Sequence, residues 1–246
     1  MKTMTSKKNN FFFEYTLTPD HYLMGKLPKL SDIEFKSEEE NGKKKLNGFI
    51  ISTKDSTFNK AEETAMMKAR RLTNYISFIQ GRHFSYFLKN NWSDVKDGKR
   101  SLRVYGVSTG EIIRTIDINL SSTSLSSLLK RDSKFNQQLA HYSRGLKASA
   151  DSDPITMFKE FYQVFDEKLL ETKNEEYKLL RDLINHPKLD NPKIKKIKTK
   201  FPKFRFDSRP KKVHLDLTLE TNLKILREIA TELKHKALIH MQTRNE

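Results

Sequence analysis

The spacing of apolar residues in the second half of the chain restricts the fold most strongly. From Phe135 onwards these residues recur at intervals of three and four, which is typical of helices with one buried face. In the last predicted helix they are Leu219, Leu223, Leu226, Ala230, Leu233, Ala237 and Met241. This spacing suits a helical bundle or one half of a helical dimer interface. We therefore predict a helical domain over residues 135–246.

Two further helices of this domain have clear start or stop signals. Asp153 followed by Pro154 predicts an N-cap and a first helical residue, before an aromatic face formed by Phe158, Phe161, Tyr162, Phe165 and Leu169. Asn174 predicts the cap of a second helix, which Pro187 stops near His186. A short connection around Thr172 predicts that these two helices form an antiparallel hairpin.

Residues 1–120 show a different pattern. The predicted strands are Phe11–Thr18, Leu46–Thr53, Val104–Val107 and Glu111–Leu120. Asn41-Gly42 is a strong turn signal within Glu38–Lys45, whereas Leu27–Phe35 predicts no defined element. Ala61–Gln80 is a predicted helix that stops at Gly81. The expected fold class is α+β: a small antiparallel sheet with one long helix in residues 1–120, a linker at 121–134, and the helical domain.

Positive charge is concentrated in Lys188–Lys212, which contains 11 Lys or Arg residues and only two acids, Asp190 and Asp207. Three prolines predict that this segment is an irregular loop, either functional or mobile. The residues expected to contact RNA phosphates are Lys195, Lys196, Lys198, Lys200 and Arg205, together with Arg144 in the first helix of the domain. For Arg144 a solvent-exposed cation is the simpler interpretation.

The composition narrows the class of partner. The formal net charge of +16 favours a polyanion, with nucleic acid ahead of an anionic membrane surface, although a lysine-rich proteome would give the same bias. The chain has no cysteine, so thiolate metal sites and disulfides are excluded. No apolar stretch reaches the length of a transmembrane helix, and the seven histidines are scattered. We expect a cytoplasmic protein without a metal, a cofactor or a membrane-inserted segment.

The motif Arg181-Asp182-x-x-x-His186 at a helix end resembles the R-x(4–6)-H signature of the HEPN superfamily. The resemblance covers roughly Phe135–Met241. The whole chain is more weakly similar to ApeA-like and MauJ-like proteins, which place a β-rich region before a HEPN-like one. Membership would imply a helical bundle, a homodimer and metal-independent cleavage of RNA, in keeping with a defence or toxin system. It would equally suit a non-enzymatic module that binds nucleic acid or protein, or an accessory protein of the MauJ type.

The resemblance assigns catalytic roles to three residues. His186 would serve as general base or acid, Arg181 would neutralise the phosphate, and Asp182 would hold the imidazole in one tautomer. Cleavage by the 2′-hydroxyl would give a 2′,3′-cyclic phosphate, and a second His186 from a dimer partner would supply the other proton transfer. The alternative is structural: Arg181 pairs with an acid such as Asp166 or Glu167, and His186 caps its own helix as a cation.

Overall fold

The computed structural model describes residues 9–22, 29–93, 102–103, 132–165, 175–185, 191–209 and 212–243. The chain divides into two compact units. The first contains residues 1–80 and 84–132, and the second contains residues 81–83 and 133–246. Most of the predicted linker at 121–134 lies outside the described residues, as do the predicted strands Val104–Val107 and Glu111–Leu120.

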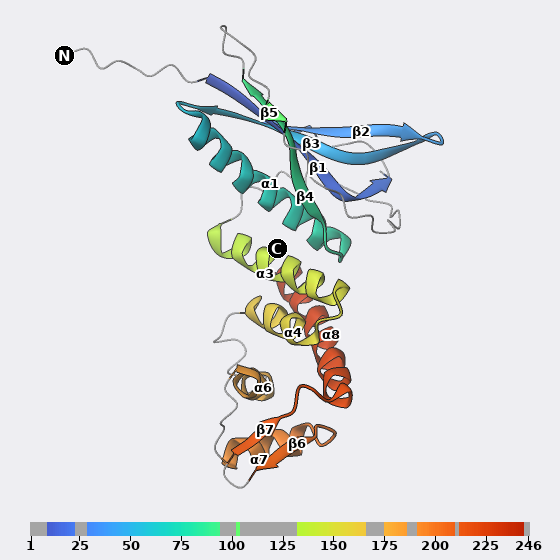
Figure 1. Ribbon diagram of the computed structural model, residues 1–246, viewed down its shortest axis with the longest axis vertical. Helices are drawn as coiled ribbons and strands as arrows, with labels where there is room; N and C mark the ends of the chain where they lie inside the picture. Colours follow the sequence, from blue (N-terminus) through green and yellow to red (C-terminus); the bar gives the residue numbers. More distant parts are fainter. Residues whose placement is uncertain are drawn as a thin grey trace, which may run out of the picture. The chain divides into compact units, whose positions relative to one another are not determined.

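The first unit is an antiparallel sheet with one long helix, α1 (Phe58–Gln80), against one face (Figure 1). The strands are β1 (Asn9–Tyr22), β2 (Ile33–Glu40), β3 (Lys43–Asp55), β4 (Ser85–Ser93) and β5 (Leu102–Arg103), and their order in the sheet is β2-β3-β1-β4-β5. All four neighbouring pairs are antiparallel. This arrangement confirms the predicted α+β class.

Buried and partly exposed side chains alternate strictly along β1, and the buried ones form part of the core of this unit. Phe11, Phe13, Tyr15 and Leu17 are buried, because successive side chains of a strand point to opposite faces and these four share the face toward α1. Alanines at positions 61, 65 and 69 of α1 are fully buried and allow the helix to approach the sheet closely. Gly81, at φ +61°, ends the helix as predicted.

The sequence prediction missed two strands of the sheet. β2 begins inside a stretch with no predicted element, because only Ile33 of this strand is buried and most of its side chains are charged or polar. β4 received no prediction, since its nine residues include two asparagines and lack regular alternation. The predicted turn is confined to Asn41 and Gly42, whose φ angles of 52° and 71° suit a two-residue hairpin loop.

The second unit is mainly helical. In it, α4 (Pro154–Gln163) packs against both α3 (Ser133–Ala150) and α8 (Glu220–Thr243). Asp153 caps α4 as predicted: its Oδ1 accepts hydrogen bonds from the N–H groups of Ile155 and Thr156, at 3.1 and 3.0 Å. The aromatic face is shorter than predicted, because α4 ends at Gln163.

The remaining elements lie next to one another along the chain and in space (Figure 1). They are α6 (Glu175–Asn185), α7 (Asn191–Lys200) and a hairpin of β6 (Phe206–Arg209) and β7 (Lys212–Leu215). The prediction of an irregular loop over Lys188–Lys212 is therefore wrong. Pro192 does not prevent a helix, because it lies in the first turn of α7, where a missing N–H costs no hydrogen bond.

Candidate functional site

Arg181 lies on α6 with its guanidinium held from two sides. Nε and Nη2 donate hydrogen bonds to Oδ1 of Asp182, at 3.1 and 3.0 Å. The guanidinium carbon lies 5.1 Å from the centre of the Tyr162 ring on α4, at a distance typical of cation–π contacts. The side chains of Arg181 and Asp182 are 22% and 23% exposed, so both remain accessible to solvent at the edge of the buried stripe.

Asp182 pairs with the residue that precedes it in the chain. Its carboxylate contacts the guanidinium of the preceding residue, and the proposed contact with the imidazole of His186 stays a prediction, because residues 186–190 lie outside the described part of the chain. The expected alternative partners, Asp166 and Glu167, lie outside it as well. The Arg181–Asp182 pair joins two neighbouring residues of α6.

A polar triad attaches α6 to α8. The Tyr177 hydroxyl donates to Oε1 of Glu232 at 2.9 Å, and Nζ of Lys236 donates to the same hydroxyl at 2.9 Å. Lys236 also forms an ion pair with Glu232 at 2.8 Å. Burial raises the pKa of Tyr177, and the hydrogen bond from Lys236 lowers the pKa of Glu232. The triad stays in its paired, charged form at neutral pH and orients the helix that carries Arg181.

Four lysines of α7 lie on the solvent side of the helix. Ile197 is fully buried, while Lys195, Lys196, Lys198 and Lys200 are exposed. Two of the lysines reach the acidic first turn of α6: Lys196 Nζ lies 2.9 Å from Oε1 of Glu175, and Lys200 Nζ lies 3.8 Å from Oε2 of Glu176. Lys198 Nζ lies 5.3 Å from the centre of the Phe206 ring. The helix thus presents four cations next to the element that bears Arg181.

Arg205 is positioned by its backbone. Its N–H donates to Oδ1 of Asn222 at 2.9 Å, and its carbonyl accepts from Nδ2 of the same side chain at 2.7 Å. Asn222 is fully buried near the start of α8 and also donates to the carbonyl of Asp216 at 2.8 Å. The Arg205 side chain remains exposed at the base of the β6–β7 hairpin. Phe204 beside it is buried, which supports a docking role for this ring.

Arg144 belongs to a cluster that the sequence analysis missed. Its Nε donates to Oε2 of Glu160 at 2.9 Å, and its Nη2 lies 2.7 Å from Nδ1 of His141. That nitrogen is itself 2.8 Å from Oε2 of Glu160. The sequence spacing could have revealed this pair. Ser152 lies in the turn between two antiparallel helices, and Arg144 and Glu160 lie eight residues before and eight residues after it. Arg144 thus links α3 to α4. It is far from the α7 lysines in the sequence, and its contacts with His141 and Glu160 do not connect it to them.

The described residues contain no group of three or more His, Cys, Asp or Glu side chains that could hold a metal ion. Of the helices in the described ranges, none is both long and apolar enough to cross a membrane. Comparisons of the chain with protein-family models, with curated proteins and with solved structures give no match.

Proposed function

We propose that the second unit is an RNA-binding module, built as a HEPN-like helical bundle, that contacts RNA through the basic segment 188–212. One observation carries this proposal: the excess positive charge of the unit is concentrated in this segment. The segment contains 11 basic and two acidic residues, whereas the rest of 133–246 contains 13 basic and 14 acidic residues. A general bias toward lysine would spread the charge over the surface. Charge confined to one segment favours a polyanionic ligand there.

The contacts of α7 support this assignment. The Lys196–Glu175 pair is exposed, with 61% and 62% of the two side chains accessible, and the Lys200–Glu176 pair is longer. Exposed pairs of this kind contribute only about 0–1 kcal/mol, so a phosphate can replace the carboxylate at little cost. The buried Ile197 keeps the helix in place while its lysines exchange partners.

The salt dependence of binding tests the proposal. A labelled single-stranded RNA is titrated with wild-type protein and with a variant in which four of the α7 lysines are changed to glutamine (Lys195, Lys196, Lys198 and Lys200). Each lysine that contacts a phosphate contributes about 0.7 to the slope of log affinity against log salt. Loss of all four contacts reduces the slope by up to about 2.8. Between about 50 and 200 mM salt, wild-type affinity then falls about 50-fold more than that of the variant.

A matched control separates local contacts from net charge. Lys44, Lys134, Lys147 and Lys224 are exposed lysines outside the segment, and their change to glutamine lowers the net charge by the same amount. We expect this control to keep most of the wild-type slope. Equal slopes for the two variants would show that RNA senses only the overall charge. Absence of RNA binding by wild-type protein would rule out the function itself.

Metal-independent cleavage of the bound RNA is a second candidate, favoured by the fixed guanidinium of Arg181. Two hydrogen bonds to Asp182 and the Tyr162 ring restrict its rotation, and a pre-oriented guanidinium stabilises a pentacoordinate phosphate better than a flexible one. His186 would take the proton from the 2′-hydroxyl, which attacks the phosphorus and displaces the 5′-oxygen. A homodimer would bring a second His186 to protonate that leaving oxygen.

Cleavage is tested with labelled RNA in excess chelator. We expect wild-type protein to release a 2′,3′-cyclic phosphate, His186→Ala to be inactive, and Arg181→Lys to recover little activity, since a point charge cannot replace a planar fork. His235, an exposed histidine on α8, supplies the control: His235→Ala keeps full activity. If wild-type protein binds RNA but leaves it intact, or if His186→Ala cuts normally, the module binds RNA without cleaving it at this pair.

A further inference from the structure

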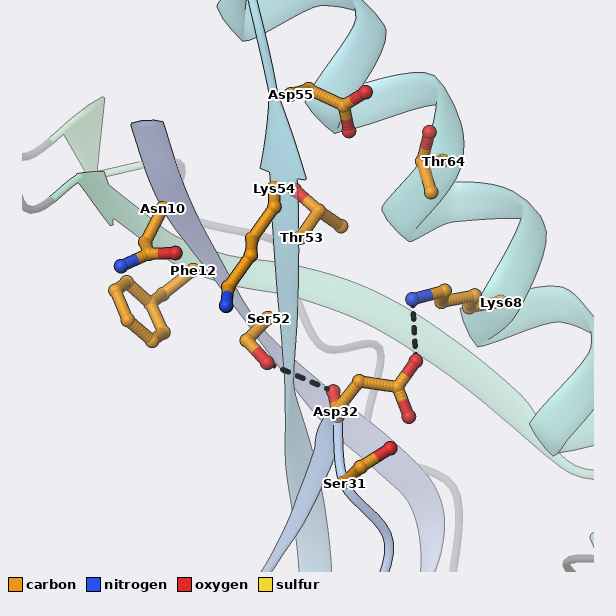
Figure 2. A pocket seen from close by; sticks show the side chains of 10 residues that line it. All are labelled: Asn10, Phe12, Ser31, Asp32, Ser52, Thr53, Lys54, Asp55, Thr64 and Lys68. Atoms are coloured by element: carbon orange, nitrogen blue, oxygen red, sulfur yellow. Dashed lines mark hydrogen bonds and ion pairs between the residues drawn. The ribbon is translucent and has the colours of Figure 1, made fainter. Parts of the chain in front are cut away.

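The first unit contains a cavity of about 590 Å³ at the end of β3 (Figure 2). This volume lies within the usual range for ligand-binding cavities. Four consecutive residues of the strand, Ser52 to Asp55, line it, and α1 contributes Thr64 and Lys68. Nine of its ten lining residues are of polar type, which favours a ligand with polar groups.

The cavity follows the edge of β3. Successive side chains of a strand point to opposite faces of a sheet, so one cavity can contact Ser52, Thr53, Lys54 and Asp55 only if it passes along the strand's edge. Figure 2 shows this arrangement: Ser52 and Lys54 extend to one side of the strand, and Thr53 extends to the other side, toward α1. A ligand that fills the cavity must therefore contact both faces of the sheet.

The backbone of β3 is exposed at this edge. β2 begins at Ile33, opposite Ile51, and the adjoining hydrogen bond runs from the N–H of Ser52 to the carbonyl of Asp32, at 2.9 Å. Backbone groups of alternate residues in a strand point the same way, so the N–H and carbonyl of Lys54 face the same side as those of Ser52. Within the described chain, no strand lies beside β3 there. One donor and one acceptor are therefore offered to a neighbour.

The buried hydroxyl of Thr53 is a second observation that points to a binding site here. Its side chain is 4% exposed, and among the described residues its buried hydroxyl has no hydrogen-bond partner. Buried hydroxyl groups in folded proteins almost always have one, since an unsatisfied group costs free energy. Thr53 is one of the lining residues, so a small displacement of its side chain brings the hydroxyl to a polar group of a ligand.

We propose that this edge binds an extended peptide segment of another protein, which pairs with β3 as an added strand next to Lys54. The charges define the preferred sequence. Asp55 lies on the α1 side of the strand, and the Lys54 ammonium lies on the opposite side. Adjacent residues of an extended peptide also point to opposite faces, so a basic residue can meet Asp55 while its acidic neighbour meets Lys54. The ion pair of Lys68 with Asp32, at 2.5 Å, bounds the groove beside α1.

Two labelled peptides test this proposal by fluorescence anisotropy with the full chain. The first is a blocked hexapeptide with the sequence threonine-valine-lysine-glutamate-valine-threonine, for which we expect saturable binding. The second has the same side chains but carries N-methyl groups on its central amides, which removes the backbone donors. We expect its affinity to be at least tenfold lower. No saturable binding of the first peptide, or equal binding of both, would overturn the proposal.

Protein variants separate the backbone from the side chains. Lys54→Ala removes the ammonium alone, whereas Lys54→Pro also removes the N–H at the open edge without touching the pairing of β3 with β1. We expect Lys54→Pro to bind the first peptide several-fold more weakly than Lys54→Ala, and Thr53→Val to bind it more weakly than wild type. Equal affinities for the two Lys54 variants would refute strand pairing. An oligomer of the wild-type chain that Lys54→Pro dissociates would identify a second copy as the occupant instead.

Discussion

Thr53→Val is expected to make the first unit more stable, although threonine and valine have nearly the same shape. The Thr53 hydroxyl is buried without a hydrogen-bond partner among the described residues, and an unsatisfied buried group costs about 1–3 kcal/mol. The valine methyl group removes this cost and adds about 0.8 kcal/mol from the burial of one carbon. Both residues favour strands, so β propensity changes little. We expect the free energy of unfolding to rise by about 2–4 kcal/mol.

The same unit offers a matched control at Thr73. This residue is 2% exposed, but its hydroxyl donates to the carbonyl of Ala69 at 2.9 Å. Thr73→Val therefore loses a hydrogen bond with a net contribution of about 0.5–1.5 kcal/mol, which the gained methyl burial roughly offsets. The two substitutions are chemically identical, so their difference in free energy of unfolding reports the state of the Thr53 hydroxyl.

Urea denaturation followed by tryptophan fluorescence measures this difference in the correct part of the chain. Trp92 is the single tryptophan, and its ring stacks on Phe12 in the sheet of the first unit, with 5.5 Å between ring centres. The signal therefore reports the unfolding of that unit. If Thr53→Val lowers the stability, or changes it by the same amount as Thr73→Val, then the hydroxyl has a partner in solution and the reasoning fails. Stabilisation together with weaker peptide binding would indicate that Thr53 is kept for its ligand.

Two predictions concern the second unit, and far-UV circular dichroism in urea measures both. Gly145→Ala should destabilise the unit by up to about 2 kcal/mol, because the new Cβ would lie 2.7 Å from the buried Phe161 ring. The overpacking costs about 1–3 kcal/mol, which exceeds the helix-propensity gain of about 1 kcal/mol. The loss of stability should shrink when Phe161→Leu is added, and strictly additive effects of the two substitutions would contradict the clash. Asp153→Ala should cost about 1 kcal/mol at neutral pH. Burial raises the pKa of Asp153, but the hydrogen bonds from Thr156 and Ile155 outweigh this effect and lower the pKa overall. The extra stability of the wild-type protein over Asp153→Ala is therefore lost as the pH falls through that lowered pKa. An advantage that persists at about pH 2 would show that the charge of the cap is unimportant.

Local signals predicted the elements that depend on local physics. The cap at Asp153, the stop at Gly81 and the turn at Asn41-Gly42 are present as expected, since each rests on the conformational preferences of one or two residues. The α8 pattern was equally clear, because its buried residues repeat over many turns. The charged β2 and the lysine-rich α7 were missed, since each buries few side chains and so carries little periodic signal.

Residues close together along the chain were enough to predict the α+β class, the limits of the long helices and the concentration of positive charge in 188–212. The folded structure was needed to establish the strand order, the pairing of Arg144 with Glu160 on another helix, and the position of the Tyr162 ring next to Arg181. It also showed that, among the described residues, β3 extends past β2 and the buried Thr53 hydroxyl has no hydrogen-bond partner. Such contacts join residues far apart in the chain, and their geometry depends on how all the elements pack together.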